Sequence, residues 1–190
     1  MLSTCAAATA QDPQHFPAYP VQPPSHYAIS TRQNDVSIGI QPVESPEDQQ
    51  TYFHTTLSSK GFLPVFVVIH NRSKTDSLLL DKGSITYGSG GSDASSPSEN
   101  SGGQKAQIAS AGFIPFIGPF ISAGMTQGLS EVKQNLVLHE LQSETLSPGE
   151  TVHGFLYVPV PKKGPRRKIH LRIPIAWSGS DKTSVQQLTF

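Results

Sequence analysis

The nine residues from Phe62 to His70 have the sequence FLPVFVVIH and decide which fold this chain can form. Valine, isoleucine and phenylalanine dominate the stretch, and these side chains favour β-strands. Both faces of the resulting strand are apolar, so each face has to be covered by other parts of the chain. The stretch therefore predicts a buried central strand in a layered, β-rich domain.

The sequence on both sides of this strand predicts its neighbours. Upstream, residues 36–40 alternate as a half-buried strand does, residues 41–50 predict a polar loop, and residues 52–57 fit either a strand or a short turn of helix. Downstream, residues 71–76 predict a polar hairpin loop, after which residues 78–80 return to pair with the central strand.

The C-terminal part of the chain repeats this alternation of turns and strands. Ser147-Pro148-Gly149-Glu150 is a turn sequence, because proline presets φ and glycine tolerates a positive φ. A strand is predicted at 152–160, and a basic hairpin tip, KKGPRR, follows at 162–167. Residues 169–175 alternate Ile or Leu with other residues, which predicts a strand with one buried face, and the last strand is predicted at 184–190.

Short strands, turn sequences and one long insertion predict a mainly β fold, and an antiparallel β-sandwich suits them better than a parallel α/β sheet. The order of a strand, Asn71, a polar turn and a strand, followed later by the Ser147–Glu150 turn and a strand, resembles the Ig-like domains of extracytoplasmic bacterial proteins. This resemblance implies an Ig-like sandwich over residues 34–190. Cys5 is the only cysteine, which excludes the disulfide of antibody domains.

The segment from Ala106 to Ser130 contains no charged residue. A flexible Gly- and Ser-rich linker at 88–103 precedes it, and an amphipathic helix is predicted at 129–141, so that the apolar and partly helical insertion covers 106–141. Its three Phe-Ile pairs are spaced to form one apolar stripe on a helix. This Phe-Ile stripe consists of Phe113, Ile114, Phe116, Ile117, Phe120 and Ile121.

Three structural roles are open for the Phe-Ile stripe. It could cover the sandwich's own core, form a contact surface for a membrane or a partner protein, or span a membrane as a helix. A span needs about 20 apolar residues. Prolines and glycines interrupt residues 106–128 and leave a dense apolar centre only from Phe113 to Ile121. That centre suits an interfacial or partly inserted hairpin better than a full span.

Charge is unevenly distributed, although the net charge is zero. Residues 1–161 carry 7 Lys and Arg against 13 Asp and Glu, whereas residues 162–190 carry 7 against 1. The basic tip contains no aromatic residue on which bases could stack, so nucleic acid is not expected as a partner. The tip is either a solvated loop or a contact with an anionic headgroup or lipopolysaccharide surface. Such a contact would use Lys162, Lys163, Arg166, Arg167, Lys168 and Arg172.

Leu2-Ser3-Thr4-Cys5 resembles the lipobox of bacterial envelope lipoproteins, in which a leucine stands three residues before the lipidated cysteine. The resemblance implies lipid attachment at Cys5, although Thr4 departs from the usual Gly or Ala and the apolar run of a signal peptide would have to lie upstream. In this interpretation residues 1–10 are the lipobox or signal remnant, and the proline-rich residues 11–33 are a semi-rigid tether. Cleavage after Ala10 would instead give a soluble periplasmic protein, and a disordered cytosolic N-terminus is the third option.

The sequence contains none of the familiar catalytic or metal-binding motifs: no HExxH, calcium loop, P-loop or nucleophile elbow. His153 and His170 lie on predicted strands that would pair across the basic hairpin, where either a two-histidine metal site or plain cross-strand packing would fit. No cofactor or metal is expected, and an enzyme is the least favoured class.

Two functions from different classes remain. The leading hypothesis is a non-enzymatic envelope lipoprotein, anchored in the outer membrane, whose apolar insertion contacts the membrane or an envelope protein. The alternative is a soluble periplasmic sandwich that binds a small ligand or a subunit, with the insertion packed on its own core. The two differ in whether residues 106–128 pack on the sandwich or project from it.

Overall fold

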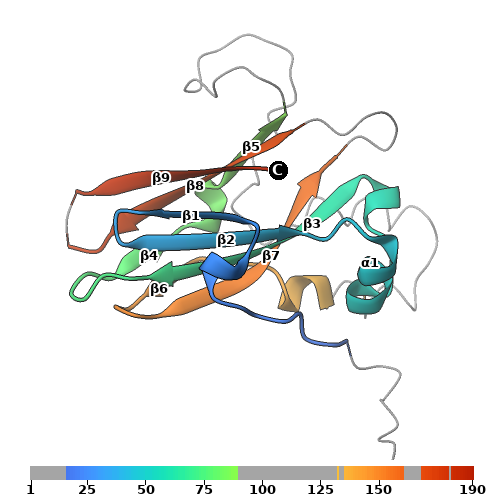
Figure 1. Ribbon diagram of the computed structural model, residues 1–190, viewed down its shortest axis with the longest axis horizontal. Helices are drawn as coiled ribbons and strands as arrows, with labels where there is room; N and C mark the ends of the chain where they lie inside the picture. The colour runs from blue at the N-terminus through green and yellow to red at the C-terminus, as the bar shows by residue number, and fades with distance from the viewer. Residues whose placement is uncertain (1–15, 90–131, 133–134, 161–167, 180) are drawn as a thin grey trace, which may run out of the picture.

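The computed structural model describes residues 16–89, 132, 135–160, 168–179 and 181–190. In this part of the chain two antiparallel β-sheets face each other, with apolar side chains between them (Figure 1). Strands clearly predominate over the short helices. The fold is therefore a mainly β, antiparallel β-sandwich, as the sequence predicts.

The first sheet has the strand order β1-β2-β3-β7, with every neighbour antiparallel. Its strands are β1 (Ile29–Gln33), β2 (Val36–Pro42), β3 (Phe62–Asn71) and β7 (Thr151–Pro159). Asn34 and Asp35 join β1 to β2 with φ angles of 50° and 62°, as tight hairpin turns that match the strand twist require. β3 lies between β2 and β7, so the predicted central strand is confirmed.

The second sheet has the order β5-β8-β4-β6, and β9 pairs with the other edge of β8. Its strands are β4 (Leu78–Leu80), β5 (Thr86–Ser89), β6 (Glu144–Leu146), β8 (Ile169–Trp177) and β9 (Thr183–Thr189). β4 and β5 pair with opposite ends of β8, and η3 (Lys82–Ser84) separates them. The strands predicted near the C-terminus are therefore confirmed as the pair β8 and β9.

The core between the sheets, called the inner cluster, is almost entirely aliphatic. β3 contributes alternate residues to it, and so does β8, whose buried and more exposed residues alternate along the strand. These residues are Leu63, Val65, Val67 and Ile69 on β3, and Ile169, Leu171, Ile173 and Ile175 on β8. Strand alternation thus places one row of each strand in the core.

The hairpin predicted between β3 and Leu78–Leu80 is wrong, because β4 belongs to the second sheet. Residues 72–77 carry the chain from one sheet to the other. The buried side chain of Asn71 fixes this corner: its Nδ2 donates to the carbonyl oxygens of Asp76 at 2.8 Å and Leu146 at 3.1 Å. Its Oδ1 accepts from the backbone N–H of Ser73 at 2.9 Å. The crossing lets Leu78 and Leu80 enter the inner cluster.

The loop predicted at 41–50 is only partly right, because α1 (Pro46–Phe53) begins inside it. The hydroxyl of Ser45 accepts from the N–H of Asp48 at 3.2 Å, and Pro46 occupies the first turn. Glu47 and Asp48 add negative charge at the positive end of the helix. A capping sequence therefore starts a helix where polarity alone suggests a loop.

The described part of the predicted tether, residues 16–33, packs on the sandwich instead of standing apart from it. β1 pairs along β2, and η1 (Pro24–His26) lies over Gly39 so closely that a Cβ there would meet the Pro24 carbonyl oxygen at 2.5 Å. Tyr27 is buried. The sandwich thus includes residues before 34, because these prolines shape a turn against the sheet.

Three further predictions concern short segments near the insertion. The turn at 147–150 is confirmed, since the N–H of Glu150 donates to the Ser147 carbonyl at 3.0 Å and Gly149 has a φ of 81°. Residues 135–138 are helical, within the helix predicted at 129–141. The linker predicted at 88–103 begins too early, because Gly88 and Ser89 belong to β5 and pair with β8. The rest of the linker, residues 106–128 and the basic tip at 162–167 lie outside the described residues.

Candidate interaction site on the outer face of the first sheet

A second hydrophobic cluster, called the outer cluster, lies on the face of the first sheet that is turned away from the second sheet. It is assembled from the sheet, α1, η1 and the short helix at 135–138, and several aromatic residues at its margin are only partly buried. Its buried members are Tyr27, Val43, Phe53, Leu57, Phe66, Val68, Leu136 and Phe155. β3 is therefore covered on both faces, as its uniformly apolar sequence requires.

Aromatic rings make up the centre of the outer cluster. Phe66 and Phe155 are paired in register on β3 and β7, with ring centroids 4.9 Å apart. Phe53 of α1 meets Phe155 edge-on at 4.9 Å. Tyr19 lies against Phe66 at 4.6 Å and against Tyr52 at 4.7 Å. These tilted and edge-on contacts are favourable aromatic geometries, and they attach the N-terminal segment and α1 to the sheet.

The helix at 135–138 lies beside α1 at one end of the molecule (Figure 1). The side-chain amide of Asn135 donates to the Tyr52 carbonyl of α1 at 3.1 Å, and the Tyr157 hydroxyl donates to the Leu136 carbonyl at 3.0 Å. Leu136 is buried in the outer cluster, whereas Val137 is 42% exposed and Leu138 is 80% exposed. Two apolar side chains of this helix therefore face away from the core.

The chain passes from this helix to the second sheet over the edge of β7. The N–H of Phe155 donates to the His139 carbonyl at 2.8 Å, and the N–H of Leu141 donates to the Phe155 carbonyl at 2.9 Å. Leu141 then enters the inner cluster. A Cβ at Gly154 would meet Leu141 Cα at 2.6 Å, so a glycine is needed for the crossing.

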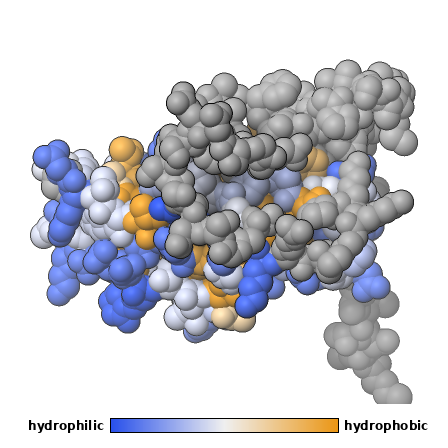
Figure 2. Space-filling model, turned by 90° about the horizontal axis from the view of Figure 1, so that it is seen from above, coloured by the Kyte–Doolittle hydropathy of each residue, from blue (hydrophilic) through white to orange (hydrophobic). Residues whose placement is uncertain are grey.

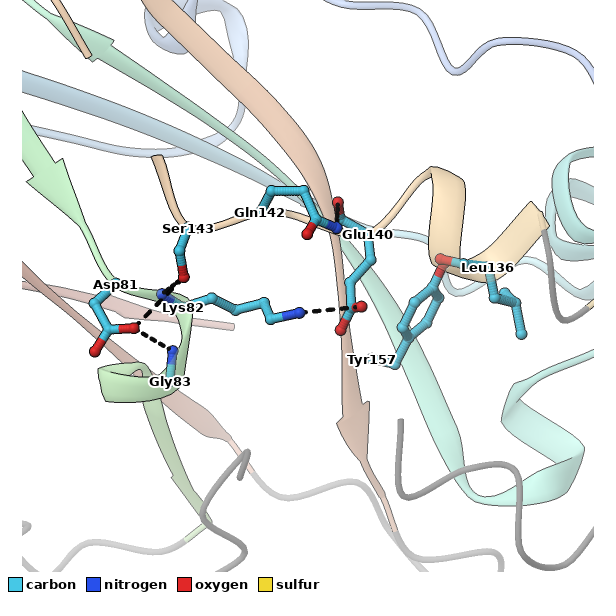
Figure 3. A network of polar contacts seen from close by, with 8 residues as sticks. All are labelled: Asp81, Lys82, Gly83, Leu136, Glu140, Gln142, Ser143 and Tyr157. Carbon is cyan, nitrogen blue, oxygen red and sulfur yellow. Dashed lines mark hydrogen bonds and ion pairs between the residues drawn. The ribbon is translucent and has the colours of Figure 1, made fainter. Parts of the chain in front are cut away.

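A polar network ties the far side of the crossing to the second sheet (Figure 3). Lys82 Nζ lies 3.1 Å from Glu140 Oε2, and the Lys82 N–H donates to the Ser143 hydroxyl at 2.9 Å. Asp81 accepts from the N–H of Gly83 at 2.9 Å and so shapes η3. Residues 135–143, which we call the brace, are thus bonded to both sheets.

Burial shifts the titration of three groups in this region. It raises the pKa of Tyr157 well above its ordinary value, and nearby Glu140 adds to the effect. It lowers the pKa of His139, to which His153 contributes by charge repulsion. It also raises the pKa of Tyr19 to about 12. Near neutral pH both tyrosines therefore keep their protons, and Tyr157 keeps its donor bond to Leu136.

Most of the residues predicted for contact lie outside the described residues. These are Cys5, the six residues of the Phe-Ile stripe, and Lys162, Lys163, Arg166 and Arg167. Of the basic set, Lys168 is exposed just before β8, and Arg172 is half-buried on β8 opposite Thr86 of β5. Seen from above, the visible apolar residues form separate small patches among polar ones (Figure 2).

The pairing predicted for the strands of His153 and His170 is wrong. β7 pairs with β3 in the first sheet and β8 pairs with β9, β5 and β4 in the second, because the chain changes sheets between Pro159 and Ile169. His153 lies near Phe66, whereas His170 bonds to Thr189 at 2.9 Å. Among the described residues no group of three or more His, Cys, Asp or Glu is placed to hold a metal ion.

A comparison with known proteins found no matching family model, no similar curated protein and no similar solved structure. Among the described residues, no helix is long and apolar enough to cross a membrane. The candidate site therefore rests on the geometry of the brace and the outer cluster.

Sequence reasoning missed the exposed pair Val137 and Leu138, and one pattern could have revealed it. Leu136, Val137 and Leu138 are consecutive, and three consecutive residues of a helix cannot all face one side. Once Leu136 is assigned to the core, at least one neighbour must face outward. No sequence pattern could have predicted the ion pair of Lys82 with Glu140, since the two residues are far apart in the chain.

Proposed function

We propose that the protein is a non-enzymatic module of the bacterial cell envelope that binds or assembles with a membrane or a partner protein. In this proposal Cys5 carries the lipid anchor, and the Phe-Ile stripe makes the contact. The observation that carries the proposal is the exposed pair Val137 and Leu138, located on the helix at which the charge-free segment rejoins the domain. Large contiguous apolar patches on a surface mark contact sites, and in this proposal the pair and the stripe together form such a patch.

The residues that fill the inner and outer clusters support a contact role for the stripe. The inner cluster is filled by residues of the two sheets and Leu141, and the outer cluster is covered by α1, η1 and the brace. The buried centre of each cluster is therefore already filled, although the margin of the outer cluster is only partly buried. In this proposal the stripe lies on another surface. Burial of each large apolar side chain contributes about 1.5–3 kcal/mol wherever that surface lies.

The alternative is a soluble periplasmic sandwich in which the insertion packs on its own domain. In this arrangement the stripe, which precedes Val137 and Leu138 in the chain, would cover them. In that case the protein would bind a small ligand or a subunit elsewhere. The two proposals differ in whether the stripe contributes to stability or to binding.

Charged substitutions in the stripe separate these proposals. The double variant Phe116→Asp with Phe120→Asp is made in the full chain, beside a control in which Ser92→Asp and Ser98→Asp add the same charge to the Gly/Ser linker. A contact surface predicts an unchanged melting temperature and loss of flotation with anionic liposomes, or of partner capture. A melting temperature that collapses only in the Phe variant would instead establish the soluble alternative.

Lipid attachment is tested separately by expression in bacteria with the upstream region of the gene. The wild-type protein should incorporate labelled palmitate, and Cys5→Ser should abolish the label. An unlabelled protein whose N-terminus maps to Gln11 would contradict the anchor and favour the secreted form. If the basic residues from Lys162 to Arg172 assist binding, flotation should weaken as salt is raised.

A further inference from the structure

A short segment before η1 lies on the outer cluster and is held there by ring contacts. This segment, residues 16–22, has the sequence FPAYPVQ, is dark blue in Figure 1, and is called the strap. Among the described residues its one hydrogen bond runs from the Gln22 N–H to the Tyr27 hydroxyl at 3.0 Å, so no hydrogen bond joins the strap to the sheet or to α1. At its start, the ring of Phe16 lies 4.2 Å from that of His54.

The ring of Tyr19 lies against an aromatic platform made by Tyr52 of α1, Phe66 of β3 and Phe155 of β7. The centroids of these rings are 4.7, 4.6 and 5.2 Å from that of Tyr19. Tilted and edge-on contacts of this kind favour any neutral aromatic ring. The platform can therefore receive one aromatic side chain, which the strap supplies in this structure.

The platform is held in place without the strap. Phe66 and Phe155 are paired in register on adjacent strands. α1 is fixed by the buried side chain of Gln49, whose Nε2 donates to the Val43 carbonyl at 2.7 Å and whose Oε1 accepts from the Ser58 N–H at 2.9 Å. A site that is ordered before binding needs little further ordering, so one occupant can replace another at small cost.

Negative charge beside the platform indicates which occupant suits it best. Glu47 and Asp48 are exposed in the first turn of α1, and neither carboxylate forms an ion pair among the described residues. Burial raises the pKa of Tyr19 to about 12, and the charge of nearby Asp48 adds to this effect. The strap has no charged residue. A segment with a basic residue beside its aromatic ring would match these charges better than the strap does.

We propose that the platform is a recognition site for a segment of a partner protein in which a tyrosine precedes a proline and a Lys or Arg is adjacent. The strap, with Tyr19 before Pro20, is its intramolecular ligand, which the partner displaces. A proline restricts the residue before it to extended conformations, so such a segment loses little entropy on binding. This site uses neither the lipid anchor nor the Phe-Ile stripe, and so goes beyond the proposed function.

Peptide binding to the full chain tests the site. In Tyr19→Ala the platform loses its contact with the strap, and a peptide of residues 16–22 should bind and shift the NMR signals of the three platform rings. The wild-type chain should bind this peptide about tenfold more weakly or worse, because the tethered strap competes at an effective concentration in the millimolar range. Val21→Ala, a control at an exposed strap residue, should behave as the wild type does.

A second set of peptides tests the charge preference. The substitution Ala18→Lys in the peptide should strengthen its binding to the Tyr19→Ala chain about two- to five-fold at low salt. Adding Glu47→Gln and Asp48→Asn to that chain should remove the gain, whereas Glu144→Gln, an exposed control on β6, should retain it. A peptide with alanine in place of its tyrosine should not bind.

Three results would overturn the proposal. Unchanged ring signals in Tyr19→Ala would show that the platform binds no peptide, and unfolding of this variant would make Tyr19 a part of the core. Equal binding of the neutral and basic peptides would remove the basic partner. Sedimentation of the wild-type chain tests the other occupant: a concentration-dependent dimer that Tyr19→Ala abolishes would show that a second copy's strap, and not a partner protein, occupies the platform.

Discussion

The inner and outer clusters lie on opposite faces of the same sheet and are built differently. The inner cluster is aliphatic and comes mainly from regular strands, each of which contributes alternate residues. The outer cluster is aromatic and joins the sheet to α1, η1 and the brace, elements that are short and far apart in sequence. The first is a core set by strand alternation, and the second is a cover whose parts could loosen separately.

A charge in the inner cluster should have the largest effect. Val67 is fully buried at the centre of β3, and Val67→Asp would bury a carboxylate without a partner, at a cost of several kcal/mol. Since domains of this size are stable by only about 5–15 kcal/mol, we expect the variant to be largely unfolded. Circular dichroism and urea titration measure this. A cooperative melt near that of the wild type would show that the two sheets are not packed as described.

A cavity in the outer cluster should destabilise less and more locally. Phe53 of α1 is buried against Phe155, and Phe53→Ala should cost about 3–5 kcal/mol. Hydrogen exchange should accelerate most in α1 and the brace, with smaller changes in β8 and β9. Uniform acceleration in both sheets would contradict a cover that loosens separately. Thr51→Ala on the exposed side of α1 serves as the control.

The smallest expected effect is a pH dependence located at His139. Because its folded-state pKa is lowered, the unfolded chain binds the proton more readily as pH falls through the ordinary value of 6.5. Stability should therefore be constant above that value and decrease below it. His139→Gln should remove part of the decrease, and His26→Gln, an exposed control, should retain it. Urea titrations at pH 5 and 7.5 compare the variants; equal slopes for His139→Gln and wild type would contradict the expectation.

The sequence could predict the inner cluster because strand alternation is a local property. Phe62–His70 and residues 169–175 specify their strands and buried rows without reference to the rest of the chain. The partner strand of Leu78–Leu80 could not be predicted in the same way. It depends on Asn71, whose amide reaches the carbonyl of Leu146, and such contacts between distant residues leave no periodic pattern.

The candidate site was harder to predict than the fold. The stripe and the lipobox-like motif are visible in the sequence but lie outside the described residues. The brace became recognisable only when the fold placed Glu140 beside Lys82. Likewise, prolines suggested a tether, although Tyr19 and Tyr27 anchor the same segment to the sheet. The aromatic residues within this proline-rich run could have indicated that it packs against the sheet.

The pairing of β3 with β7 also has a consequence for folding kinetics. His70 and Thr151 are neighbours across this pair, yet they are 81 positions apart in the chain. Non-local pairing of this kind is slow, because a long loop must close before any contact forms. The closure entropy, however, grows only logarithmically, by about 0.6 kcal/mol for each doubling of the loop. Residues 90–131 lie inside this loop, so a change in the length of that segment should alter the folding rate little.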